Sequence, residues 1–101
     1  MALDFYRLDN KEYLFGLEDK QFEELSGIFT DFQYQTGLII DQNGDFKMTV
    51  ENQEAIISII DRYIDKNDLN KNKSKTLTII EFRTHLKDCS QRKLELQLIG
   101  D

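Results

Sequence analysis

The chain has 101 residues, of which 40% are hydrophobic, and it carries a formal net charge of −6. This length, without a Pro-rich or Gly/Ser-rich linker, predicts one domain with one modest core. No apolar run approaches the roughly 20 residues of a membrane-spanning helix, and a single cysteine excludes both an internal disulfide and a cysteine-rich zinc site.

The amino-terminal residues predict a cytoplasmic protein. Met1-Ala2-Leu3-Asp4 lacks the basic stretch and the apolar core of a secretory signal. The low cysteine content fits a reducing compartment.

Charge is distributed unevenly along the chain. Residues 1–65 carry 14 acidic and five basic side chains, a balance of −9, whereas residues 66–93 carry three acidic and eight basic side chains, a balance of +5. An acidic body repels phosphate backbones, so nucleic-acid binding is not expected unless the basic segment, residues 66–93, acts alone. The same body would attract a basic protein from a distance. A negative balance that only keeps the protein soluble is the simpler alternative.

Two strands are predicted near the amino terminus. In residues 2–8, Leu3 and Phe5 fall on one side of the two-residue period of a half-buried strand. Residues 12–17 are rich in strand formers and can pair back on the first strand as a hairpin, although Gly16 weakens the pattern.

Residues 19–35 predict one amphipathic helix. Its apolar residues recur at spacings of three and four and so share one face: Phe22, Leu25, Ile28, Phe29 and Phe32. Gly27 inside this helix costs roughly 1 kcal/mol against Ala, which suggests a position of close packing. Gly37 suits the left-handed residue that often ends a helix.

A β-hairpin is predicted between residues 38 and 50. Asn43-Gly44 is the strongest turn signal in the sequence, because both central positions of a type I′ turn need a positive φ, which Asn tolerates and Gly adopts freely. The predicted arms are Leu38-Ile39-Ile40 on one side and Phe46, Met48 and Val50 on the other.

Two further helices and a closing strand follow. Thr49 is predicted to cap a helix over residues 50–65, and the isoleucine stripe of this helix marks it as the central core helix. Residues 66–75 are nearly all polar and predict a mobile, solvated connection. A third helix is expected over residues 76–91, and residues 94–99 alternate apolar with polar side chains like a strand.

These elements predict an α+β fold for a single domain, residues 1–101. Their order neither alternates regularly nor repeats, so we expect a small sheet, at least partly antiparallel, with about three amphipathic helices packed on one face. Both terminal strands are expected to belong to that sheet.

Glu81, His85 and Cys89 recur every four residues on the third helix and invite interpretation as metal ligands or as a Cys-His nucleophile. The helical geometry argues against both interpretations. Cys89 belongs to the apolar stripe, whereas His85 lies about 80° and Glu81 about 120° from its centre. We therefore expect a buried thiol beside a histidine at the boundary of the core.

Other catalytic and metal-binding motifs are incomplete or absent. Two stretches resemble calcium loops only in part, because position 6, where glycine is required, is Phe46 in one and Lys75 in the other. The sequence has no phosphate-binding loop and no nucleophile elbow. We expect no bound metal, no cofactor and no enzymatic activity.

A loose motif lies between the first and second predicted helices: Thr36-Gly37, Asp41 and Gly44-Asp45. Together with the apolar helix before it and the capped helix after it, this motif resembles small bacterial immunity proteins, which neutralise polymorphic or contact-dependent growth-inhibition toxins. The resemblance covers residues 12–65 and the terminal residues 96–101. Those families differ in fold and share no functional residues, so the resemblance implies only a role, which is to bind and block a toxin domain.

We therefore expect an intracellular inhibitor that binds a basic toxin domain, such as a nuclease, by presenting carboxylates where the toxin expects phosphate. The candidate partner-binding residues lie at the predicted hairpin and along the second helix: Asp41, Asp45, Glu51, Glu54, Asp61 and Asp65. Asp45, Glu51 and Glu54 are expected to form one cluster because they are near one another in sequence. Alternatively, Glu51 and Glu54 only complement the helix dipole.

The second hypothesis is a cytoplasmic adaptor or regulatory module that uses the basic segment to contact nucleic acid or an acidic protein. Its candidate residues are Lys71, Lys73, Lys75, Arg83, Lys87, Arg92 and Lys93. The segment lacks interleaved aromatic residues for base stacking, which disfavours nucleic acid. No membrane partner is expected, and the sequence leaves the oligomeric state open.

Overall fold

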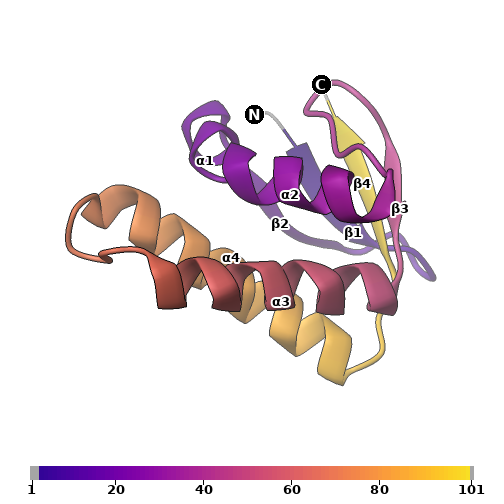
Figure 1. Cartoon of the computed structure of the whole chain (residues 1–101). Coiled ribbons are helices and arrows are strands. Elements are labelled where there is room, and N and C mark those ends of the chain that lie inside the picture. Colours follow the sequence, from indigo (N-terminus) through magenta and orange to yellow (C-terminus); the bar gives the residue numbers. More distant parts are fainter. Residues whose placement is uncertain (1–2, 101) are drawn as a thin grey trace.

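The computed structural model describes residues 3–100 (Figure 1). In chain order its elements are β1 (Leu3–Arg7), β2 (Tyr13–Leu17), α1 (Asp19–Glu24), α2 (Ser26–Thr36), β3 (Phe46–Met48), α3 (Val50–Lys66), α4 (Lys73–Gln91) and β4 (Leu96–Gly100). The predicted α+β class is confirmed, with four helices in the described residues instead of three. Residue 2 of the predicted first strand lies outside the described residues. None of these helices is long and apolar enough to cross a bilayer.

The four strands form one antiparallel sheet in the order β2-β1-β4-β3. As predicted, both terminal strands belong to this sheet. They lie side by side at its centre, where Phe5 pairs with Leu98. β1 and β2 form the hairpin that the sequence allows, and a bulge after Phe5 leaves one extra residue in β2.

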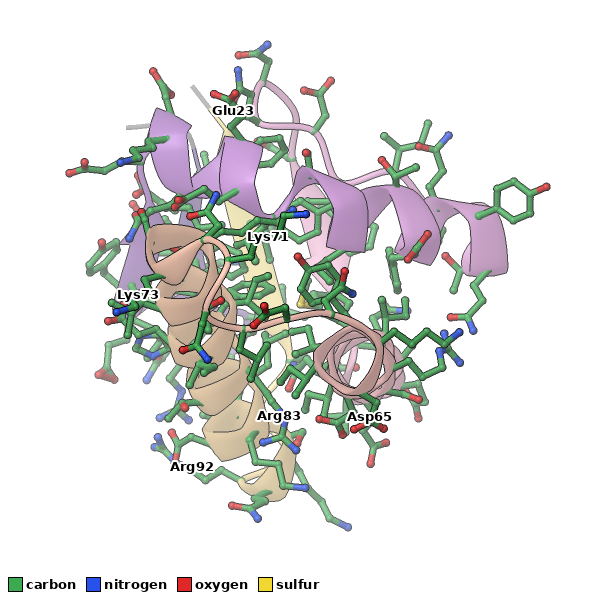
Figure 2. The ribbon with its side chains drawn as sticks, turned by 60° about the vertical axis from the view of Figure 1, so that its left-hand side comes forward. Glu23, Asp65, Lys71, Lys73, Arg83 and Arg92 are labelled. Carbon is green, nitrogen blue, oxygen red and sulfur yellow. The ribbon has the colours of Figure 1, made fainter. Side chains whose placement is uncertain are left out.

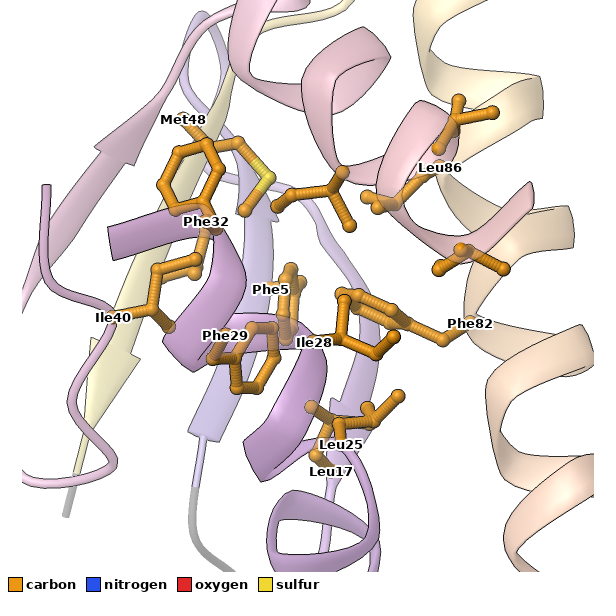
Figure 3. Packing of buried hydrophobic residues seen from close by; sticks show 14 of the residues in the cluster. Phe5, Leu17, Leu25, Ile28, Phe29, Phe32, Ile40, Met48, Phe82 and Leu86 are labelled. Carbon is orange, nitrogen blue, oxygen red and sulfur yellow. The ribbon is translucent and has the colours of Figure 1, made fainter. Parts of the chain in front are cut away.

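One face of the sheet is buried under the helices (Figure 3). Successive strand residues point to opposite faces, and the buried set consists of Leu3, Phe5, Phe15, Leu17, Met48, Leu96 and Leu98. The ring of Phe82 on α4 lies 5.7 Å, between ring centroids, from both Phe5 in the sheet and Phe29 on α2. This aromatic contact joins the two layers at the centre of the core.

The predicted hairpin between residues 38 and 50 is wrong. Residues 38–40 form no strand, and β3 pairs instead with β4, with Phe46 opposite Leu98. β4 offers alternating buried leucines that continue the core-facing side of the sheet, whereas two of the three residues at 38–40 remain exposed. Burial therefore overrides proximity in sequence as the criterion for pairing.

The turn also differs from the predicted type. A type I′ turn needs a positive φ at Asn43 and Gly44, and neither residue has one. The Gly44 amide donates to the carbonyl of Asp41 at 3.2 Å, and the Asp41 carboxylate accepts from the Asn43 amide at 2.9 Å. The aspartate side chain therefore shapes this turn.

The predicted helix over residues 19–35 is in fact two helices. Leu25 separates α1 from α2 with φ −92° and ψ 0°, and its amide is shared between the carbonyls of Gln21 (3.0 Å) and Phe22 (3.1 Å). At the start of α1, the Gln21 side chain accepts a hydrogen bond from the Glu18 amide at 2.9 Å. The apolar spacing continues across Leu25, so the sequence pattern does not reveal the interruption.

Two glycines near α2 have different roles. Gly37 has a φ of 77° and ends the helix as predicted, with its amide donating to the carbonyl of Gln33 at 2.8 Å. The prediction that Gly27 permits close packing is wrong, because a Cβ at this position would meet no atom within 4 Å.

α3 and α4 start at capped residues. Thr49 caps α3 as predicted, accepting from the Asn52 amide at 3.1 Å, while the Asn52 side chain accepts from the Thr49 amide at 3.0 Å. α3 buries four isoleucines and is the expected core helix. α4 begins at Lys73, earlier than the predicted residue 76, because Asn72 caps it. The polar connection is therefore shorter than expected and spans residues 67–72.

Candidate functional site

The strand register gathers acidic side chains at one end of the sheet. Leu3 pairs with both Leu17 and Gly100, so the start of β1 and the ends of β2 and β4 lie together. The turn before β3 meets the same end, because a Cβ on Gly100 would clash with the backbone at Gln42. We call this region the acidic end, defined by Asp4, Glu18, Asp19, Glu23, Asp41 and Asp45.

Part of the acidic end is a hollow between α1 and the turn. Asp19 and Glu23 on α1 and Asp41 in the turn all line this hollow, which has a volume of about 540 Å³. Half-buried Phe22 also lines it and packs on Phe29 with ring centroids 5.2 Å apart. The hollow therefore combines carboxylates from two separate segments with an apolar surface.

Glu24 fixes the position of α1 relative to α4. Its two carboxylate oxygens accept hydrogen bonds from the hydroxyls of Ser74 and Thr78, both at 2.7 Å. These hydrogen bonds lower the pKa of Glu24. The bond from Ser74 has the largest effect, and the bond from Thr78 lowers the pKa further. α1 thus carries Glu23 on a helix that is anchored to the main body of the protein.

Among residues 3–100, no cationic side chain forms an ion pair within 4 Å with any of these six carboxylates. The ion pairs in this part of the chain use other acids, and the only cation within α1 is Lys20. Glu18 and Asp41 also take part in local structure, at the start of α1 and in the turn respectively. In Figure 2, Glu23 lies at the top of the view, while Arg83 and Arg92 follow α4 toward the bottom.

The predicted cluster of Asp45, Glu51 and Glu54 does not form. Asp45 precedes β3 and Glu51 follows it, so the length of the strand, about 10 Å at roughly 3.3 Å per residue, separates the backbones of the two residues. Glu51 and Glu54 instead line a second hollow with Glu95 and Lys93. Glu51 also lies in the first turn of α3, where it complements the helix dipole.

The last two predicted acids belong to neither hollow. Asp61 forms an ion pair with Arg83, with 2.7 Å between Oδ1 and Nε, so its charge is compensated within the protein. Asp65 is exposed one helical turn further along α3. Of the six predicted residues, the structure therefore brings only Asp41 and Asp45 to the acidic end.

Several cations of the basic segment already have partners within the protein. Arg83 pairs with Asp61, and Arg92 pairs with Asp88 four residues earlier at 3.2 Å. The ammonium group of Lys75 lies 5.3 Å from the centre of the Tyr63 ring. The segment consequently presents less free positive charge than its composition suggests.

The environment of Cys89 is that of a core residue. The thiol is 4% exposed, and burial is the main cause that raises its pKa, which disfavours the nucleophilic thiolate. His85 stacks on Phe15 with ring centroids 4.2 Å apart. Among the described residues, no group of three or more His, Cys, Asp or Glu side chains is arranged to hold a metal ion.

Two groups of surface residues are not predicted by the sequence patterns. The first group is Asp4, Glu18, Asp19 and Glu23, whose closeness to the turn depends on the strand order and so cannot be seen in the sequence. A second group follows the end of α2, where Tyr34 is 93%, Ile39 59% and Leu38 40% exposed. The predicted hairpin places Leu38 and Ile39 in a strand, so it does not predict their exposure.

Comparison of the chain with models of protein families, with curated proteins and with solved structures gave no match.

Proposed function

We propose that the protein binds and neutralises a basic toxin domain in the cytoplasm, in the manner of the small bacterial immunity proteins that its sequence resembles. The acidic end is the observation that carries this proposal. Its six carboxylates come from three segments and have no ion pair among the described residues. Like charges held together cost folding free energy, and a partner that supplies cations would offset that cost.

The charge arrangement suits fast association with a basic partner. Complementary potentials steer the encounter of two proteins and raise the association rate, more strongly at low salt. A nuclease domain carries cations that bind phosphate, and a group of carboxylates fixed on folded elements can occupy that surface. The α1 hollow adds the apolar surface of Phe22 to these charges.

The alternative is an adaptor that acts through the basic segment. The intramolecular pairs of Arg83 and Arg92 and the stacking of Lys75 reduce the free charge available for such a role. A mobility-shift measurement at low salt is the direct test of its nucleic-acid version. We expect no shift with RNA or DNA.

The proposal is tested by the gene neighbourhood and by a growth assay. We expect a gene for a large secreted toxin immediately upstream, and we expect this chain to restore growth when it is expressed with the carboxyl-terminal domain of that toxin. A toxin that arrests growth equally with and without the chain would contradict the proposal, as would an unrelated metabolic neighbourhood.

A further inference from the structure

The face of the sheet opposite the helices presents an unusual set of side chains. Because Leu3 and Phe5 point into the core, the residues that alternate with them point to the other face. Pairing across the strands places neighbours from β2 and β4 beside them. We call this surface the open sheet face, defined by Asp4, Tyr6, Tyr13, Gln97 and Ile99.

Among residues 3–100, one oxygen atom of Asp4 on this face receives no hydrogen bond. Its Oδ1 is shielded from solvent, and no described residue donates to it. Its partners across the strands are Gly16, which has no side chain, and Ile99, which has no donor in its side chain. A covered carboxylate oxygen without a donor is costly, and such groups are rare in folded proteins. A positive charge held over the exposed part of this carboxylate would offset that cost without contacting Oδ1.

Two tyrosine rings frame the position next to Asp4. Tyr6 and Tyr13 pair across β1 and β2, and their rings meet edge to face with centroids 5.5 Å apart. Burial raises the pKa of Tyr13, and the nearby negative charge of Asp4 raises it further. Tyr13 is nonetheless 50% exposed, so its ring is accessible to a partner.

We propose that the open sheet face docks an arginine side chain of a basic protein partner, with the guanidinium over Asp4 and its stem against Tyr6 and Tyr13. This inference rests on the proposed function for the identity of the partner as a basic protein. Arginine fits best because its planar group is always charged and can stack on aromatic rings while it lies over the exposed part of the carboxylate. Asp4 also belongs to the acidic end, so the same approaching cations would reach both surfaces.

The described cations of the sheet leave this position free. Lys47 on β3 points to the same face, but two strand spacings separate β3 from β1, or about 10 Å. Arg7, further along β1, is held by Asp9 at 2.8 Å. Neither cation forms an ion pair with Asp4.

The experiment uses hexa-arginine amide as the probe, with the full chain labelled for amide NMR. We expect the largest shifts at the amides of Asp4, Tyr6, Tyr13 and Ile99. Asp4→Asn, which keeps the size of the side chain, should weaken binding about tenfold, as expected for the loss of one charge at a partly exposed contact. Asp41→Asn removes the same charge from the acidic end without changing the open sheet face, and it should weaken binding much less.

Equal weakening by Asp4→Asn and Asp41→Asn would overturn the inference, as would shifts centred on α3 or α4. Tyr13→Ala is a second variant that removes a half-exposed ring and should also weaken binding. If toxin neutralisation fails while the probe docks on the open sheet face, the proposed function is wrong and the docking site stands. If the probe does not dock there, the site is wrong whether or not the protein neutralises a toxin.

Discussion

Gly100 at the end of β4 and Gly44 in the turn before β3 are in close contact. A Cβ built on Gly100 would lie 2.7 Å from the Gly44 amide nitrogen and would also overlap the carbonyl oxygen of Gln42. Both neighbours are backbone atoms, which cannot move aside as a flexible side chain can. This contact fixes Asp41 and Asp45 beside the end of the sheet.

Gly100→Ala should therefore displace the turn and destabilise the protein. We expect a loss of about 1–3 kcal/mol in the free energy of unfolding, the usual cost of overpacking. Denaturant unfolding measures the loss, and amide NMR should place the largest changes at residues 41–45. An unchanged stability together with an unchanged turn would contradict the contact.

Glu24 predicts a specific dependence of stability on pH. Its pKa is lowered in the folded protein from the ordinary 4.5, chiefly by the hydrogen bond from Ser74. A lowered folded-state pKa contributes stability that is fully present above pH 4.5 and is lost as the pH falls through the folded-state value. The difference in unfolding free energy between the native protein and Glu24→Gln should shrink as the pH falls below 4.5. Equal pH profiles for the two proteins would rule out this contribution.

Gly27 offers a stabilising substitution. It is exposed inside α2, it has no positive φ, and a Cβ there would meet open space. Gly27→Ala should raise the free energy of unfolding by about 0.5–1 kcal/mol, because Ala loses less backbone entropy in a helix. A lower thermal midpoint for Gly27→Ala would mean that the position is packed after all.

The ion pair between Asp61 and Arg83 predicts that Asp61 has a structural and not a partner-binding role. Both side chains are partly exposed, at 50% and 32%, so the coupling free energy in a double-mutant cycle should be about 0.2–1 kcal/mol. Asp61→Asn should leave the affinity for a basic partner nearly unchanged. A large loss of affinity from this one substitution would show that Asp61 contributes to partner binding.

Local patterns in the sequence predict most of the secondary structure. The cap at Thr49, the helix end at Gly37 and the apolar stripe of α3 each depend on residues close in sequence. The failures occur where long-range pairing decides. β3 finds its partner in β4, about 50 residues away, and among the described residues no strand pairs with its other edge.

The acidic end could be predicted only in part for the same reason. The turn signal identifies Asp41 and Asp45, although the turn type that it predicts is wrong. Asp4, Asp19 and Glu23 approach them only because β1 lies between β2 and β4. No spacing in the sequence reveals that strand order. The cluster predicted from proximity therefore groups Asp45 with Glu51 and Glu54, which lie beyond the other end of β3.

Binding of the neighbouring toxin domain to two variants of equal charge tests the central claim most directly. One variant carries Asp19→Asn, Glu23→Gln and Asp45→Asn in the acidic end, and the matched control carries Glu51→Gln, Glu54→Gln and Asp65→Asn elsewhere. Calorimetry at one fixed salt concentration gives both affinities. We expect the first variant to lose affinity on the order of 100-fold or more and the control to lose far less. Equal losses, or a loss confined to the control, would contradict the assignment of the acidic end as the binding surface.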